Sequence, residues 1–394
     1  MPKVLIVQAR MPSFRVPFFT KLHEALCKDG ADLKVAYSRP NRSHALRQDD
    51  AELPAEFGYK VNANWLGERF VYQPLWREIM QADLTIVGPE NKYLNNLWLL
   101  PLSAIRLKAV AFWGLGPHMH PDRRSVTSEW FKERSAATVD WWFAYTESVA
   151  TNLRKHGVPE ERITVVQNAT DTVELRRLLN DISEQETAEG RRTVTGNAES
   201  KIGFYCGRLD SAKALPFLIE SARIVRRRCP KFHLVIVGNG PDRDWLEQIA
   251  SAEPWIHYLG SKWGRDSALL YKMADIFLLA GTAGLAIVDS FAAGLPLIAT
   301  ELANHPPEIS YLRHRENGMI TGHDPNKYAD GIAEVFESPD LLAKLRQGAG
   351  IAGARYTIEA MVENFRLGIN RCLGQRRFSA RHNITRQSMP RTQD

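Results

Sequence analysis

Two cations lie close together in one short loop of the sequence. Arg208 and Lys213 follow an apolar run at residues 202–206 that predicts a strand, and they precede the apolar stripe of a helix. Open parallel sheets bind their ligands beyond the carboxyl ends of the strands, so this loop is placed to meet a ligand. An arginine fork and a lysine point charge suit phosphate oxygens, and fixed cations stabilise the charge that develops on a departing phosphate. Arg208 and Lys213 are therefore candidate catalytic residues, with two solvated loop cations as the alternative.

Glycines follow three of the predicted strands. Gly207 opens the loop of Arg208, Gly238 begins a Gly-Asn-Gly-Pro turn, and Gly281 and Gly284 flank a small-residue loop before a helix that starts at Leu285. Small side chains let a phosphate approach backbone N–H groups at a helix start. Tight strand-to-helix turns also need glycine, so each glycine by itself is only weak evidence of phosphate binding. We assign these five residues to phosphate and nucleotide binding.

Acidic residues follow the same loops. Asp289 falls one turn into the helix that starts at Leu285, where a carboxylate can accept ribose hydroxyls or merely interact with the helix dipole. Glu308, after two prolines, either contacts the ligand or caps a short helix. The run Asp242-Arg243-Asp244 imitates a metal-binding D-x-D motif, but it opens a predicted helix, where Asp is favoured as a cap. We therefore predict no metal site.

Alternating strands and helices must position these loops. In the first half, short apolar runs at 4–7, 33–36, 84–87, 109–113 and 142–145 predict strands, and the second half repeats the alternation with runs at 202–206, 233–237, 276–279 and 297–299. Such alternation predicts parallel sheets covered by helices on both faces, an α/β fold. Tyr72, Leu75, Trp76 and Ile79 have helical spacing and are assigned to a core-facing helix.

The chain is too long for one hydrophobic core, so two domains are expected. We place an amino-terminal domain at 1–180, a polar linker at 181–200 and a second domain at 201–356. A helix at 357–374 is expected next, followed by a basic disordered tail at 375–394.

The ordered set from Gly203 to Gly318 resembles the donor-binding domain of GT-B glycosyltransferases, in the large retaining family 4 type (glycosyl transferases group 1). Gly207-Arg208-Leu209, Lys213, the glycine turn at 238–241, Asp289, Gly294-Leu295-Pro296 and Pro307-Glu308 carry the resemblance. It implies two doubly wound Rossmann-like domains facing a cleft, with the C-terminal helix crossing back. It also implies retaining, metal-independent transfer of a hexose from a nucleoside diphosphate sugar, of UDP or GDP type, to a glycan or lipid-linked acceptor in cell-envelope polysaccharide synthesis.

One acid of the family pattern is missing. The family has two glutamates separated by seven residues, and this chain has Gly281 and Asp289 at those places. Because the first glutamate touches the transferred sugar in the family, the sugar is left open. Two alternatives to a transferase stand: a nucleotide-sugar epimerase, which shares the same fold, and a non-catalytic nucleotide-sugar-binding protein, which Gly281 and Leu115 suggest.

The sequence gives weaker evidence for the residues that bind and activate the acceptor. His118 is the candidate for the acceptor-activating group, with His120 as an alternative, because the family often carries a histidine near this point and Leu115 stands in its place. Arg10 and Arg15, after the first strand, are candidates for binding an anionic acceptor.

Charge and composition exclude several classes of protein. The formal net charge is +6, and residues 371–394 hold +5 of it, from six arginines and one aspartate, so a nucleic-acid-binding face is not expected. This basic segment suggests peripheral contact with anionic lipid, or a solvated tail. No apolar run approaches the roughly eighteen residues of a membrane span, and no leader precedes the first strand. The scattered cysteines fit a reducing compartment, so we predict a cytoplasmic protein. The resemblance implies no cofactor, because the nucleoside diphosphate sugar is a substrate.

Overall fold

The chain folds into two compact units. The computed structural model describes residues 1–42, 49–67, 69–119, 126–302 and 304–387. The first unit contains residues 1–168 together with the described chain from Ile358 onward, and the second contains Ala169–Thr357.

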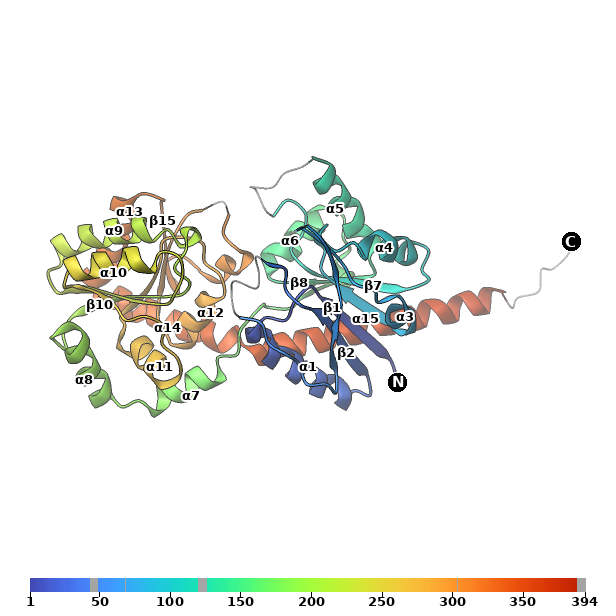
Figure 1. Ribbon diagram of the computed structural model, residues 1–394, viewed down its shortest axis with the longest axis horizontal. Coiled ribbons are helices and arrows are strands. Elements are labelled where there is room, and N and C mark those ends of the chain that lie inside the picture. The colour runs from blue at the N-terminus through green and yellow to red at the C-terminus, as the bar shows by residue number, and fades with distance from the viewer. Residues whose placement is uncertain (43–48, 68, 120–125, 303, 388–394) are drawn as a thin grey trace, which may run out of the picture. The chain divides into compact units, whose positions relative to one another are not determined.

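A parallel sheet of seven strands forms the centre of the first unit, in the order β3-β2-β1-β6-β7-β8-β9 (Figure 1). Its central strands consist mostly of buried apolar residues, as expected for a parallel sheet that helices cover on both faces. A two-stranded antiparallel ribbon, β4-β5, accompanies it. The strands are β1 (Lys3–Gln8), β2 (Asp32–Ser38), β3 (Gly58–Val61), β4 (Asn64–Leu66), β5 (Phe70–Tyr72), β6 (Leu84–Val87), β7 (Ala109–Gly114), β8 (Trp141–Ala144) and β9 (Ile163–Val165). The helices are η1 (Ser13–Arg15), α1 (Val16–Lys28), α3 (Trp76–Gln81), α4 (Asn96–Ala104), α5 (Val126–Thr138), α6 (Glu147–Lys155), η3 (Glu160–Arg162) and α15 (Ile358–Gln387).

The second unit contains a parallel sheet of six strands in the order β12-β11-β10-β13-β14-β15. Helices lie on both of its faces, with α9, α10 and α13 on one and α7, α11 and α14 on the other (Figure 1). The strands are β10 (Lys201–Cys206), β11 (Phe232–Val237), β12 (Ile256–Tyr258), β13 (Ile276–Leu279), β14 (Leu297–Thr300) and β15 (Gly318–Thr321). The helices are α7 (Val173–Asp181), α8 (Glu184–Thr195), η4 (Ser211–Lys213), α9 (Leu215–Arg228), α10 (Arg243–Ala252), α11 (Gly264–Met273), α12 (Ala286–Ala292), η5 (Pro307–Tyr311), α13 (Pro325–Glu337) and α14 (Pro339–Arg355). The predicted pair of doubly wound Rossmann-like halves is confirmed.

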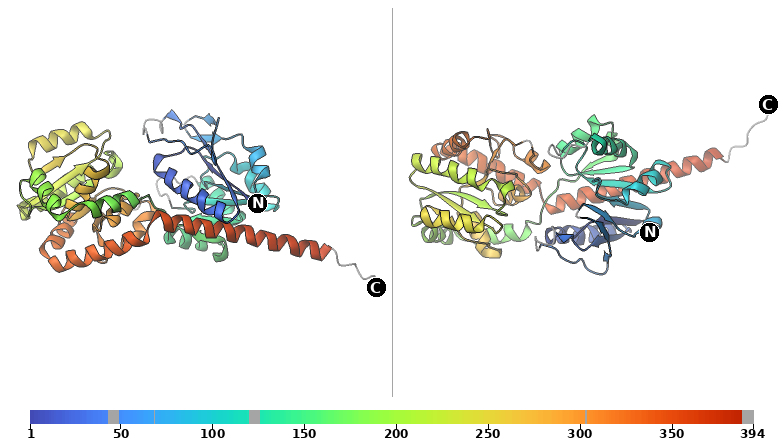
Figure 2. Two further views of the ribbon diagram at one scale, coloured as in Figure 1. Left: turned by 90° about the horizontal axis from the view of Figure 1, so that it is seen from below. Right: turned by 45° about the horizontal axis from the view of Figure 1, so that its top comes forward.

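Helix α15 returns to the first unit, which confirms the predicted crossing helix. It packs against α1 and against strands β8 and β9 (Figure 2). Phe365 stacks on Phe143 with ring centroids 4.5 Å apart, and its edge meets Trp113. Gly368 makes this approach possible, because an added Cβ would lie 2.6 Å from Thr164 Oγ1.

The C-terminal segment differs from the expected disordered tail. Helix α15 continues to Gln387, beyond the predicted end at 374, and residues 388–394 lie outside the described chain. Its buried apolar side chains include Phe365, Ile369 and Cys372. Gly374 does not end the helix, and the residues from 375 to 387 include no proline. The loss of apolar periodicity in the sequence therefore did not mark the end of the helix.

The expected linker at 181–200 is largely helical. Ser183 and Glu186 form a reciprocal capping box at the start of α8, and Gly196 ends the helix in the left-handed conformation. Arg191 anchors it to the second unit through Asp275 Oδ2, 3.1 Å away. The second unit therefore begins at Ala169 and includes α7, which the predicted boundary at 180 had given to the first.

The aromatic stripe at 72–79 is only partly as predicted. Leu75 and Ile79 are buried, but Tyr72 belongs to β5 and α3 begins at Trp76, whose side chain is exposed. The predicted helix was too long because a strand residue had the same spacing by chance.

Candidate functional site

Four loops meet at the carboxyl edge of the second sheet. They follow β10, β11, β13 and β14; backbone hydrogen bonds join the first three, and the side chain of His305 joins the fourth to the loop after β13. Leu209 N donates to Asn239 O at 3.0 Å, and Thr282 N donates to Ala212 O at 2.9 Å. The candidate residues from Gly207 to Glu308 thereby come together at the edge where parallel sheets bind ligands.

Lys213 occupies the centre of this layer. It ends the short helix η4, and its half-buried ammonium donates to Thr282 O at 2.7 Å. Burial lowers the pKa of Lys213, while the charge of Asp210 works in the opposite direction. The next residue, Ala214, has φ +50°, an uncommon left-handed conformation for a residue with a side chain. A partly desolvated cation whose hydrogen bonds go to uncharged oxygens would gain strongly from an anionic ligand.

Arg208 lies in the same loop and is more exposed. Its Nε is 2.9 Å from Asp210 Oδ2, and 45% of its side chain is accessible. Asp210 therefore lies beside both cations, a position that the sequence analysis overlooked. The pair leaves the guanidinium free to reorient toward a phosphate, because exposed ion pairs of this kind are weak.

The glycine turn after β11 approaches the Arg208 loop closely. Gly238 has φ +146°, and an added Cβ would lie 1.8 Å from Gly207 O. An added Cβ at Gly240 would lie 2.2 Å from Leu209 O. Glycine is required at both places because no side chain fits between the two loops.

Gly281 is equally confined, which explains the missing family acid in physical terms. An added Cβ there would lie 2.4 Å from Ala212 O and 2.4 Å from the carbonyl carbon of Lys213. The Lys213 loop thus occupies the volume that any side chain at 281 would need. Gly284 differs, since an added Cβ there would meet no atom within 4 Å. Leu285 is the N-cap residue of α12.

Asp289 lies one turn into α12, as predicted. Burial raises the pKa of its carboxyl to about 6, and a hydrogen bond from Thr170, 3.1 Å away, acts in the other direction. The hydroxyl of Thr170 already satisfies one carboxylate oxygen, so a ribose hydroxyl would compete for it or use the other. The ribose role stays a prediction.

The loop after β14 contributes Glu308 and an overlooked histidine. Glu308 lies within η5 and is 4% exposed, so it is a buried residue of a short helix. His305 Nε2 donates to Thr300 O at 2.7 Å, and its Nδ1 accepts from Ala283 N at 3.1 Å. Burial lowers the pKa of His305, and the charge of Lys213 adds to this shift. His305 therefore fixes the loop that follows Gly281.

A hollow of about 460 Å³ adjoins the glycine turn. Tyr258 donates to Gly238 O at 3.0 Å, and Trp263 is 77% exposed at its rim. Aromatic side chains beside a phosphate-type loop can stack on a planar base. The sequence signal was Trp263 itself, an aromatic residue in a polar loop. The hollow is lined by Asn239, Arg243, Glu247, Tyr258, Gly260, Ser261 and Trp263.

The D-x-D run begins helix α10, as predicted. Asp242 is its N-cap residue but makes no side-chain capping hydrogen bond, and Asp244 lies in the first turn. The prediction that these carboxylates hold no metal stays a prediction.

The acceptor-side candidates lie in the first unit. His118 follows β7 and contacts Glu133, with Nε2 and Oε1 2.5 Å apart, and the alternative His120 lies outside the described residues. Arg10 is paired with Asp49 and Asp50. Arg15 is buried and donates to Asn168 Oδ1 at 2.7 Å. Both arginines thus serve contacts within their own unit.

Comparison with known proteins identifies both halves of the chain. Residues 200–338 match the family model "Glycosyl transferases group 1", and residues 18–174 match "Glycosyltransferase Family 4". A D-inositol 3-phosphate glycosyltransferase from Thermobispora bispora is 27% identical over 214 residues, which are 50% of this chain and 48% of that protein. A protein of the same name from Saccharomonospora viridis is 25% identical over 80% of this chain and 75% of its own. The chain thus spans about half the length of the first of these relatives.

Solved structures share the fold. HepE from Anabaena, crystallised with UDP, has a TM-score of 0.68 at 18% identity and covers 94% of this chain and 100% of its own. Sucrose-phosphate synthase from Thermosynechococcus elongatus has a TM-score of 0.63 at 15% identity and covers 96% and 100%. The likeness identifies a GT-B fold. Among the helices of the described chain, none has the length and apolar character that a membrane span requires.

Proposed function

The chain belongs to the group 1 and family 4 glycosyltransferases, and on that premise we propose that it transfers a hexose from a nucleoside diphosphate sugar, of UDP or GDP type. The observation that carries the proposal is the environment of the Lys213 ammonium. This partly buried ammonium has an uncharged carbonyl as its near partner, and Arg208 lies in the same loop. A diphosphate would bind beside these groups and supply the missing negative charge.

The proposed reaction retains the configuration of the sugar. The bond between the sugar C1 and the diphosphate oxygen breaks, and a bond from C1 to the acceptor oxygen forms on the same face. The leaving diphosphate oxygen takes the proton of the acceptor hydroxyl. Arg208 and Lys213 stabilise the charge that develops on the diphosphate, so neither a metal ion nor a pair of carboxylates is needed. The proposed transfer differs in this respect from glycoside hydrolysis, which canonically uses two carboxyl groups that flank the scissile bond.

The remaining donor groups are proposed to hold the nucleotide. The glycine turn at Gly238 and the hollow beside Trp263 would receive the base, and Asp289 would contact the ribose. Gly284 and Leu285 would leave backbone N–H groups open to the phosphates. The confined Gly281 means that the transferred sugar is held without a family-type acid at that position.

The acceptor is proposed to be a glycan or a lipid-linked glycan of the cell envelope, held by the first unit in the cytoplasm. Peripheral membrane contact would come from the basic residues 375–394. Only the family resemblance and this charge support the acceptor class.

A panel of UDP- and GDP-sugars should separate the proposal from its alternatives. The full chain is incubated with each donor, with and without simple glycan acceptors, and nucleotide and sugar products are followed by chromatography and NMR. We expect one nucleotide series to release nucleoside diphosphate with free or transferred sugar. An isomerised donor would instead identify an epimerase, and binding without any turnover would identify a nucleotide-sugar-binding protein.

A further inference from the structure

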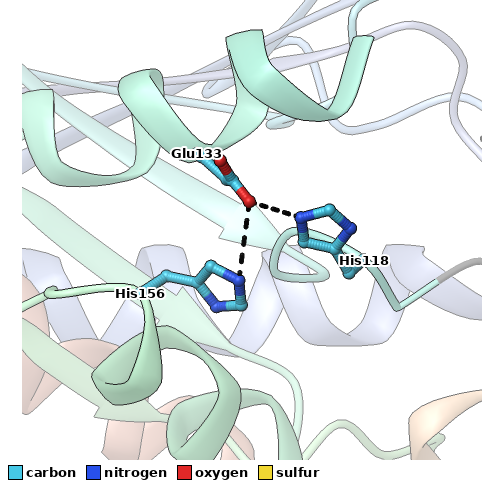
Figure 3. Close-up of side chains that lie close together, drawn as sticks. All are labelled: His118, Glu133 and His156. Carbon is cyan, nitrogen blue, oxygen red and sulfur yellow. Dashed lines mark hydrogen bonds and ion pairs between the residues drawn. The ribbon is translucent and has the colours of Figure 1, made fainter. Parts of the chain in front are cut away.

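Two histidines and a glutamate converge within the first unit. His118 comes from the loop after β7, Glu133 from α5, and His156 from the C-cap position of α6 (Figure 3). One ligand-type atom of each residue lies within 4.8 Å of the other two. Because they stand far apart in sequence, only the fold brings them together.

The hydrogen bonding of His156 determines which of its nitrogens faces the cluster. Its Nδ1 lies 2.9 Å from the backbone oxygen of Asn152. A carbonyl oxygen can only accept, so Nδ1 carries the hydrogen. In a neutral imidazole, Nε2 then presents a lone pair, and this atom lies 3.8 Å from Glu133 Oε1. The space between these two acceptor atoms is where a cation would bind.

His118 completes the arrangement. Its Nε2 lies 2.5 Å from the same Oε1, and its ring stacks on that of His156 with centroids 5.3 Å apart. The backbone of His118 has φ +58°, which is uncommon for a residue with a side chain. A single divalent cation would accept a lone pair from each of the two rings and from the Glu133 carboxylate.

We propose that His118, Glu133 and His156 bind one Zn²⁺ ion. Two imidazoles and a carboxylate are a donor set that suits this borderline cation, and three protein ligands leave a fourth position for water or another ligand. With metal–ligand bonds of about 2.0–2.2 Å, ligand atoms on a tetrahedral ion are about 3.3–3.5 Å apart. The His118–Glu133 pair at 2.5 Å would open by about 1 Å, and the His156–Glu133 pair at 3.8 Å would close by less than that.

The hydrogen bond from His156 to Asn152 supports this assignment. Zinc-bound histidines usually donate their second N–H to a carbonyl or carboxylate, which fixes the ring and its tautomer. The ion would join the loop after β7 to α5 and to the end of α6. It would belong to the first unit, whereas Arg208 and Lys213 belong to the second, so the inference does not depend on the proposed donor reaction.

Zinc titration of the full chain tests the proposal without any activity assay. The protein is stripped with a chelator, dialysed, and titrated with ZnCl₂ by calorimetry, and its melting temperature is followed with and without zinc. We expect one equivalent to bind and to raise the melting temperature. Glu133→Gln and His156→Ala should each weaken binding by about a hundredfold or more and abolish the zinc-dependent shift, because each removes a ligand.

His23→Ala is the matched control. His23 Nε2 lies 3.2 Å from Glu56 Oε1, so this variant also removes a histidine–glutamate pair, but one without a second imidazole. Zinc affinity should be unchanged in it. The variants are compared only where their zinc-free melting temperatures show that they fold. Absence of zinc binding by the wild-type chain, or equal zinc affinity in Glu133→Gln and in the wild type, would overturn the proposal. The contact between His118 and Glu133 would then be an ordinary hydrogen bond.

Discussion

Replacing Arg208 or Lys213 by alanine should lower turnover about a hundredfold or more, the usual worth of one preorganised group that stabilises developing charge. Lys213 is expected to show the larger loss because its ammonium is partly desolvated, which strengthens its interaction with a diphosphate. Initial rates at saturating donor, with the donor found in the panel, measure both effects.

Arg223→Ala is the control for the loss of a cation. Arg223 lies on α9 of the same unit, is paired with Glu253 and is 43% exposed, so its removal should leave turnover unchanged. Melting temperatures of all three variants show whether an activity loss reflects unfolding. Wild-type turnover in both the Arg208 and the Lys213 variants would remove the diphosphate assignment.

Gly281→Ala should destabilise the second unit and impair turnover together. The added Cβ would collide with backbone atoms of Ala212 and Lys213, which cannot move aside as a flexible side chain would. Overpacking of this kind lowers the free energy of unfolding by about 1–3 kcal/mol. The clash can be reduced by a shift of the loop that carries Lys213, and such a shift would impair turnover. Denaturant unfolding and initial rates measure the two effects.

Gly284→Ala provides the comparison within the same loop. Because its added Cβ meets open space, this variant should unfold at the wild-type denaturant concentration. Gly281→Glu, which restores the acid of the family pattern, should behave like Gly281→Ala or worse. If Gly281→Ala proves as stable as Gly284→Ala, the close approach of the Lys213 loop to Gly281 is wrong.

The parallel strands could be predicted because burial on both faces leaves a strong local signal. Runs such as Ile276–Leu279 are apolar throughout, and the candidate loops followed directly from where these runs end. Short edge strands such as Ile256–Tyr258 escaped prediction, because three residues carry too little pattern. Helix α8 escaped because its exposed face is polar, although the capping box of Ser183 and Glu186 was legible in the sequence.

Contacts between distant segments could not be predicted. His305 fixes the loop after Gly281 through Ala283, and nothing local to His305 distinguishes it from a solvated histidine. The same holds for Glu133 and His156, whose meeting with His118 depends on the packing of α5 and α6 beside the end of β7. The lack of a side chain at 281 was visible in the sequence, but its cause is the neighbouring Lys213 loop.

Calorimetric titration of the full chain with UDP and with GDP in the presence of EDTA tests the central claim most directly, because the account assigns the charge of the diphosphate to Arg208 and Lys213 and to no metal ion. We predict that one of the two nucleotides binds in EDTA, that added Mg²⁺ leaves its affinity unchanged, and that Lys213→Ala weakens it. Stripping zinc from the first unit should not alter this result. Failure of both nucleotides to bind, or binding that requires Mg²⁺, would contradict the account.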